Sequence, residues 1–109
     1  MTSVQLTNYL RSNRKRLALS QDEVAFLMGT RSGAKISRYE RFAREPNLKT
    51  AFAFEVIYKR AACELFNGLY QTVEKEVAER AKILTYRKDR KPGVMAARKR
   101  ETLTVLAKI

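Results

Sequence analysis

The stretch that decides the fold lies at residues 20–29 and reads Ser20-Gln21-Asp22-Glu23-Val24-Ala25-Phe26-Leu27-Met28-Gly29. Ser20 and Glu23 have the spacing of a capping box, in which the serine hydroxyl accepts a hydrogen bond from the third helical amide and the glutamate reaches back. Gly29 is suited to end this helix in the left-handed conformation. The stretch therefore predicts one short helix with a sharp start and a sharp end.

Helices are also expected on both sides of this stretch. Over residues 4–17, side chains recur on one face at steps of four, four and three: Leu6, Leu10, Arg14 and Leu17. A third helix is expected from the N-cap Ser32 to about Arg41. Within it, Glu40 follows Ile36 by four residues and shares its inward face. Arg14 and Glu40 therefore each lie on an otherwise apolar face.

The chain beyond the third helix also has helical periodicity. Residues 44–47 predict a loop, and residues 48–58 predict a fourth helix with one side formed by Leu48, Ala51, Phe52 and Glu55. A fifth, continuous helix is expected over 62–88, where an apolar stripe includes Leu65, Leu69, Val73 and Val77, with Phe66 and Leu84 beside it. At 1.5 Å per residue it would be about 40 Å long, so part of its stripe should lack a partner within the chain.

The segment after Pro92-Gly93 fits two kinds of structure. A strand is suggested by the alternation of Leu103, Val105, Ala107 and Ile109, and a helix by the spacing of Met95, Thr102, Leu106 and Ile109. The helix is favoured because residues 96–101 are good helix formers. Since no long run of alternating β-branched residues occurs earlier, the predicted fold class is all-α.

Positive charge is concentrated at both ends of the chain. The 109 residues carry 23 Lys and Arg against 11 Asp and Glu, a formal charge of +12. Residues 1–49 contribute +6 (ten basic, four acidic), residues 50–79 contribute −2 (three and five), and residues 80–109 contribute +8 (ten and two). Clustered Lys and Arg of this kind indicate a polyanionic partner.

The residue types present argue against an enzyme or a metalloprotein. The chain has no His and one Cys, so Ser-His and Cys-His catalytic pairs and the usual zinc ligands are missing. We expect no catalytic residue, no metal and no cofactor. Cys63 is expected to be a small buried core residue. No apolar run reaches the roughly 18–20 residues of a membrane span and no signal-peptide pattern opens the chain, so a cytoplasmic protein without membrane contact is expected.

Several motifs together resemble a known family. They are residues 19–25, then Leu27-Met28-Gly29, Ile36-Ser37-Arg38-Tyr39-Glu40-Arg41 and Arg44-Glu45-Pro46. In this order they resemble the helix-turn-helix DNA-binding domain of phage repressors (XRE, or Cro and lambda-repressor type) over residues 5–66. The resemblance implies a five-helix lambda-repressor-like domain over 1–66, here followed by an extension of the fifth helix over 67–91 and a basic helical segment over 92–109. One departure is that Gly29 and Ile36 are seven residues apart rather than the usual six, which places an inserted residue near Thr30-Arg31.

The resemblance also implies roles for individual residues. Arg14 and Glu40 match a pair that forms a buried salt bridge in such repressors. A helix-turn-helix places the N-terminal part of its second helix in the major groove, and the corresponding base-contacting residues here are Gly33, Ala34, Lys35, Ser37 and Arg38. The expected phosphate contacts are Gln21, Arg31, Ser32, Arg41 and Arg44. Since Gly33 and Ala34 offer little hydrogen bonding, specificity is expected to depend on Lys35, Arg38 and DNA shape.

The favoured function is a sequence-specific regulator of transcription that binds double-stranded DNA, a repressor rather than an activator. A homodimer is expected because one recognition helix covers only a few base pairs. Its candidate seam consists of Leu69, Val73, Val77 and Leu84, unless this stripe packs on the first four helices. The alternatives are an antitoxin, whose C-terminal segment masks a toxin, and a basic RNA- or ribosome-associated adaptor.

A second basic block lies outside the region of resemblance. It consists of Arg87-Lys88-Asp89-Arg90-Lys91 and Arg98-Lys99-Arg100. This block can lie along the DNA backbone or in the minor groove, bind RNA, or form a solvated helix face. Pro92-Gly93 would be the hinge between its two parts.

Overall fold

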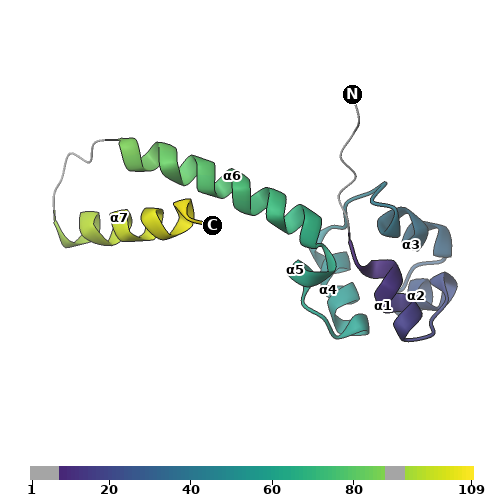
Figure 1. The fold of residues 1–109 in the computed structure, drawn as a ribbon. Helices are drawn as coiled ribbons and strands as arrows, with labels where there is room; N and C mark the ends of the chain where they lie inside the picture. The colour runs from purple at the N-terminus through teal and green to yellow at the C-terminus, as the bar shows by residue number, and fades with distance from the viewer. Residues whose placement is uncertain (1–7, 88–92) are drawn as a thin grey trace, which may run out of the picture. The chain divides into compact units, whose positions relative to one another are not determined.

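The structure, a computed structural model, describes residues 8–87 and 93–109 (Figure 1). Within these residues it contains seven helices and no strand: α1 (Leu10–Arg16), α2 (Gln21–Leu27), α3 (Gly33–Glu40), α4 (Leu48–Tyr58), α5 (Ala62–Leu65), α6 (Asn67–Tyr86) and α7 (Val94–Ala107). The predicted all-α class is therefore confirmed for the described part of the chain. The chain divides into two compact units, Met1–Leu69 and Tyr70–Ile109.

The core of the first unit is one cluster of buried side chains contributed by α1 to α5. Its most completely enclosed large members are Tyr58, Phe54, Leu10, Ile36, Leu65 and Val24. The ring of Phe54 lies at the centre, with its centroid 5.7 Å from those of Tyr39 and Tyr58. Helices as short as α1 to α3 are marginal on their own, so this shared burial is what stabilises them.

The start of α2 has the predicted capping box. Ser20 Oγ accepts a hydrogen bond from the Glu23 amide at 3.0 Å, and Glu23 Oε1 accepts one from the Ser20 amide at 2.8 Å. Both bonds satisfy amides that would otherwise lack a partner at the helix end. The capping box predicted for Ser20 and Glu23 is therefore confirmed.

The end of α2 and the start of α3 are also confirmed. Gly29 has φ 78°, and the next amide, of Thr30, donates to the Ala25 carbonyl oxygen at 2.9 Å. This is a Schellman-type end, which needs a left-handed residue at the glycine position. Ser32 caps α3 by accepting a hydrogen bond from the Ala34 amide at 3.1 Å. Residues 28–32 therefore form a defined turn between two helices.

Stability should depend on pH through the capping box. Hydrogen bonds with Ser20, chiefly that from its backbone amide, lower the pKa of Glu23 below the ordinary value of 4.5. The ionised carboxylate therefore stabilises the folded chain at neutral pH, and this contribution is lost as the pH falls through the lowered pKa. Urea unfolding of the parent chain and of Glu23→Gln should differ at neutral pH and converge under acid.

The matched control for this prediction is Glu45→Gln, which neutralises an exposed glutamate in the loop before α4. The control should follow the parent chain across the titration, because its carboxylate caps no helix described here. A stability difference between Glu23→Gln and the parent that stays constant down to about pH 3 would exclude the ionised cap as its source.

Helix α1 is shorter than the predicted helix over 4–17. It begins at Leu10, and Asn8 and Tyr9 precede it in non-helical conformation. Asn8 Oδ1 accepts a hydrogen bond from the Leu10 amide at 3.1 Å, and its Nδ2 donates to the Tyr39 carbonyl oxygen at 3.0 Å. Asn8 therefore starts the helix and ties it to α3, while Leu6 lies outside the described residues.

Helix α4 has the predicted bounds, and its buried residues are Phe54 and Tyr58. Phe54 and Tyr58 are fully buried and Ala51 packs against the core, whereas Leu48 and Phe52 are 70% and 53% exposed. The side predicted to hold Leu48, Ala51, Phe52 and Glu55 is thus not the side that carries the buried residues of this helix. Apolar residues occur on several sides of this helix, so periodicity alone does not identify the side that is buried.

The continuous helix predicted over 62–88 is in fact two helices. Phe66, with φ −112° and ψ 46°, separates α5 from α6. Just before it, the Leu65 carbonyl oxygen accepts a hydrogen bond from the Tyr9 amide at 2.8 Å. The break allows the adjacent Leu65 and Phe66 both to enter the core, whereas neighbours on a regular helix point about 100° apart.

Cys63 is exposed, and the expectation that it belongs to the core is wrong. Helix α5 has only four residues, and its inward side is occupied by Leu65. The small apolar residues around Cys63 therefore reflect a short surface helix.

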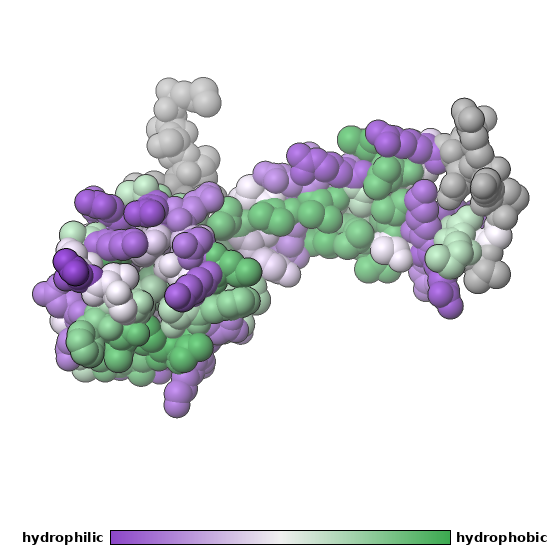
Figure 2. Space-filling model, turned by 180° about the vertical axis from the view of Figure 1, so that it is seen from behind, coloured by the Kyte–Doolittle hydropathy of each residue, from purple (hydrophilic) through white to green (hydrophobic). Residues whose placement is uncertain are grey.

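The second unit contains most of α6 together with α7, which run antiparallel (Figure 1). Residues 94–107 are helical, as favoured from the sequence. The buried apolar residues described in the second unit are Ala78 and Ala81 on α6 and Ala96 and Leu103 on α7. Large apolar side chains nevertheless remain exposed along α6 (Figure 2): Tyr70, Val73, Val77, Ile83, Leu84 and Tyr86.

Candidate nucleic-acid interface

Helix α3 has one face in the core and one face open to solvent. The buried face consists of Gly33, Ile36 and Tyr39. The exposed face consists of Ala34, Arg38 and, at the C-cap, Arg41. These three exposed residues follow one another at steps of four and three, so they lie on one side of the helix. Lys35 and Ser37 are half-buried.

Gly33 is buried, so it serves packing rather than the base contact predicted for it. Its amide donates a hydrogen bond to Asp22 Oδ1 at 3.1 Å, which joins the start of α3 to α2. A Cβ at this position would overlap the same carboxylate oxygen and lie 3.0 Å from the Asp22 nitrogen. A larger residue here would therefore displace the Asp22 carboxylate and crowd the backbone at the start of α2.

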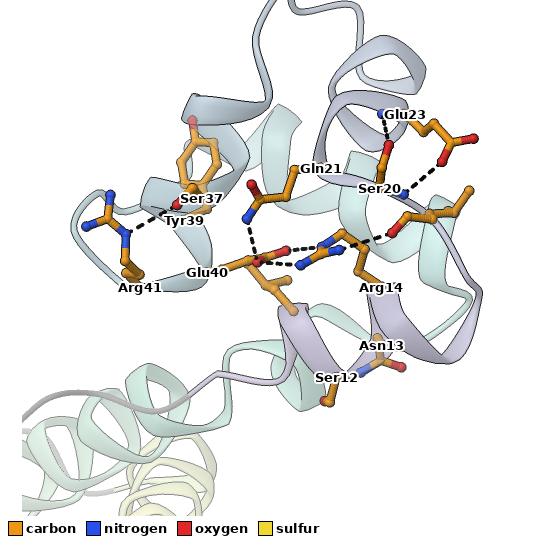
Figure 3. Close-up of polar contacts among 12 residues, drawn as sticks. Ser12, Asn13, Arg14, Ser20, Gln21, Glu23, Ser37, Tyr39, Glu40 and Arg41 are labelled. Carbon is orange, nitrogen blue, oxygen red and sulfur yellow. Dashed lines mark hydrogen bonds and ion pairs between the residues drawn. The ribbon is translucent and has the colours of Figure 1, made fainter.

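The other predicted base-contacting residues surround the open face of α3. Ser37 Oγ accepts a hydrogen bond from Arg41 Nε at 3.3 Å, which holds the guanidinium beside the helix end (Figure 3). Arg38 is exposed on the same helix. The structure thus brings Arg38, Arg41 and Ala34 together on one surface.

Arg14 and Glu40 form the expected ion pair between α1 and α3 (Figure 3). Arg14 Nε lies 2.6 Å from Glu40 Oε2, and its Nη2 lies 3.2 Å from Oε1. The third nitrogen, Nη1, donates to the Leu19 carbonyl oxygen at 3.1 Å. The side chains of Arg14 and Glu40 are 11% and 3% exposed. The hydrogen bond to Glu40 raises the pKa of Arg14, so the guanidinium stays charged.

Gln21, predicted to contact phosphate, is part of the same network. Its Nε2 donates a hydrogen bond to Glu40 Oε1 at 3.1 Å. This bond connects α2 to the pair that joins α1 and α3. Gln21 therefore positions Glu40 in the free protein, whatever else its side chain contacts.

A hollow in the surface lies beside this network. It is lined by Arg11, Arg14, Ser20, Gln21, Ser37, Glu40 and Arg41. Arg11 and Arg41, both exposed, bring two cations from different helices to one place. Arg11 is missing from the predicted contacts, although its position three residues before Arg14 already puts it on the same side of α1.

The remaining predicted phosphate contacts do not line the hollow. Arg31 and Arg44 are exposed in the segments before and after α3. Ser32 is exposed too, but its hydroxyl caps α3. Arg31, Ser32 and Arg44 therefore lie near the two ends of α3. The exposed arginines that line the hollow are Arg11 and Arg41.

Tyr58 carries a buried polar group next to the ion pair. Its hydroxyl has no hydrogen-bond partner among the residues that the structure describes. Burial, and then the nearby Glu40 carboxylate, raise the pKa of Tyr58, so the phenol is neutral.

In the second unit, the described basic residues lie on the surface. Arg98, Lys99 and Arg100 are exposed on α7, and Arg87 is exposed after α6. Residues 88–91 and Pro92 of the proposed hinge lie outside the described residues. Of the candidate seam, Leu69 is half-buried and the other three residues, Val73, Val77 and Leu84, are exposed.

Comparisons with protein-family models, curated proteins and solved structures find no significant match. Within 8–87 and 93–109, no three His, Cys, Asp or Glu side chains are grouped so that they could hold a metal ion. No helix among the described residues combines the length and apolarity needed to cross a membrane. The functional interpretation of this site is therefore based on its geometry.

Proposed function

We propose that the chain is a sequence-specific DNA-binding repressor of transcription, with α2 and α3 as its helix-turn-helix. The observation that carries the proposal is the division of α3 into a buried face and an exposed face bearing Arg38 and Arg41. The Arg14–Glu40 ion pair joins α3 to α1, and the hydrogen bond from the Gly33 amide to Asp22 joins α3 to α2, so the orientation of the exposed face is fixed. A rigid helix with an open basic face is suited to the major groove.

The exposed residues divide into two kinds of contact. Arg38 has the guanidinium that pairs bidentately with O6 and N7 of guanine. Lys35 is the second base-reading side chain, and Ala34 is small enough to contact a thymine methyl group. Arg41 and Arg11, with Arg31 and Arg44 at the ends of α3, are suited to phosphates, which position the protein without reading sequence.

The chain is proposed to act as a homodimer on two half-sites. A single helix of eight residues reads only a few base pairs, whereas two copies related by a two-fold axis read a site with matching symmetry. Phage-repressor-like regulators are the family that the motifs resemble, and this resemblance favours repression over activation.

Selection of bound duplexes from a random DNA pool tests the proposal. The full chain should enrich a two-fold site. Arg38→Ala should relax the preference at one position of each half-site, with a loss of about 1–3 kcal/mol of discrimination. The matched control Arg44→Ala should weaken binding about equally for all sequences. It should also lower the slope of log binding constant against log salt concentration by about one, as expected for the loss of one phosphate contact.

Other outcomes decide against the proposal. A pool without an enriched motif, combined with tight binding of single-stranded or structured RNA, would favour the RNA-associated adaptor. An enriched motif that Arg38→Ala leaves unchanged would remove α3 as the reading element. Binding of a small toxin-like protein by residues 93–109 would favour the antitoxin.

A further inference from the structure

Helices α6 and α7 form a hairpin with several exposed apolar residues on one side, while Ile83, Tyr86 and Val105 are exposed on other sides. In α6, Val73, Val77 and Leu84 lie roughly 90° around the helix from the buried Ala78 and Ala81, at 3.6 residues per turn. Apolar surface along α6 is visible in Figure 2. A large apolar stripe left open on one helix is typical of an interaction surface.

Helix α7 extends this surface. Met95, Thr102 and Leu106 lie roughly 90° from the buried Ala96 and Leu103, measured in the same sense along the chain. Because α6 and α7 run antiparallel, equal rotations about the two helix axes bring both stripes to the same side of the hairpin. The two stripes therefore form one two-helix apolar face.

The charges along α6 indicate what covers this face. Residues 67–79 hold Glu74, Glu76 and Glu79 against Lys75, a net charge of −2, whereas residues 80–87 hold Arg80, Lys82 and Arg87 with no acidic residue, a net charge of +3. A helix with opposite charge in its two halves is complementary to a second copy of itself when the copies run antiparallel. A parallel arrangement would place like charges together.

The spacing of the stripe is consistent with such a pair. Val73, Val77, Arg80 and Leu84 follow at steps of four, three and four, the pattern of a helix–helix seam. A two-fold axis between residues 78 and 79 sets Val73 opposite Leu84 of the second copy. The same axis brings Glu76 next to Arg80 of the second copy, where these side chains now form only an exposed contact of 3.9 Å within one helix.

We propose that this apolar face of α6 and α7 binds the same face of a second copy, with the two α6 helices antiparallel, to form a four-helix bundle. The inference does not depend on DNA binding, because every residue that carries it lies in the second unit. Its test accordingly uses the full chain without DNA.

Sedimentation of the full chain should show a dimer, and Val73→Glu should weaken self-association by more than about 100-fold, because the new carboxylate would be buried opposite Leu84 of the second copy. The matched control is Val56→Glu, which makes the same change at an apolar side chain on α4 that is 74% exposed. Both variants should keep their helical circular dichroism, since neither residue is in a core.

Cross-linking tests the orientation in a Cys63→Ser background. If the helices are antiparallel, Val73 lies opposite Leu84 of the second copy. A mixture of Val73→Cys chains and Leu84→Cys chains should therefore form an intermolecular disulfide, whereas either variant alone should form little disulfide. The proposal is overturned if the parent chain is monomeric at all concentrations, if Val73→Glu dimerises as the parent does, or if each cysteine variant cross-links efficiently with itself.

Discussion

Arg14→Ala should lower the free energy of unfolding by about 3 kcal/mol, because it leaves a buried carboxylate without its cation. The Glu40 side chain is 3% exposed and, among the residues that the structure describes, would keep the hydrogen bond from Gln21 alone. The Leu19 carbonyl oxygen would lose its contact with Arg14 as well. Domains of this size are stable by about 5–15 kcal/mol, so the change should lower the melting temperature by well over ten degrees.

Two further variants distinguish the effect of breaking the Arg14–Glu40 ion pair from the effect of removing any positive charge from α1. Arg11→Ala removes an exposed arginine from the same helix and should change the stability by less than about 0.5 kcal/mol. The double variant Arg14→Met with Glu40→Leu should recover much of the loss, because two apolar side chains leave no buried charge unpaired. Equal melting temperatures for Arg14→Ala and Arg11→Ala would show that the pair contributes nothing to folding.

Gly33→Val should destabilise the chain by about 2–4 kcal/mol and weaken DNA binding at all sequences. The added side chain would overlap the Asp22 carboxylate and press on the Asp22 backbone, so α3 must move away from α2. Overpacking of this kind costs about 1–3 kcal/mol, and loss of the hydrogen bond between the Gly33 amide and Asp22 adds about 1 kcal/mol. Chemical unfolding and duplex titration measure the two effects.

The matched control is Ala34→Val at the next residue of the same helix. Ala34 is exposed, so the substitution should change stability by only about 0.5 kcal/mol, the cost of a β-branched residue in a helix. Its effect on DNA should be a change of preferred bases rather than a uniform loss. If Gly33→Val and Ala34→Val are equally stable, the close approach of α3 to α2 is not needed for folding.

The parts of the fold that could be predicted depend on residues close together in the chain. The capping box of Ser20 and Glu23, the left-handed Gly29 and the N-cap Ser32 each act within a few residues. The pairing of Arg14 with Glu40 could also be anticipated, although they are far apart in sequence. Spacing places each of these charges on an apolar face, and the resemblance to phage repressors implies that the two residues pair.

The parts that could not be predicted depend on which surfaces meet. Spacing suggested a continuous helix through Phe66, yet the core accepts both Leu65 and Phe66 only if the helix breaks. The sequence also placed Gly33 among the base-reading positions, and nothing in its neighbours along the chain reveals the Asp22 backbone behind it. Arg11 was missed because the hollow it lines is built from three separate helices.

Local sequence is thus sufficient to set the ends of α2, α3 and α4, since hydrogen bonds within one turn control where a helix starts and stops. The choice of the buried side of α4, the break at Phe66 and the packing role of Gly33 follow only from the assembled core. Burial depends on contacts between residues far apart in the chain, as in the bond from the Tyr9 amide to the Leu65 carbonyl oxygen. Helical periodicity shows which residues share a side, but close packing against the rest of the chain selects the side that faces inward.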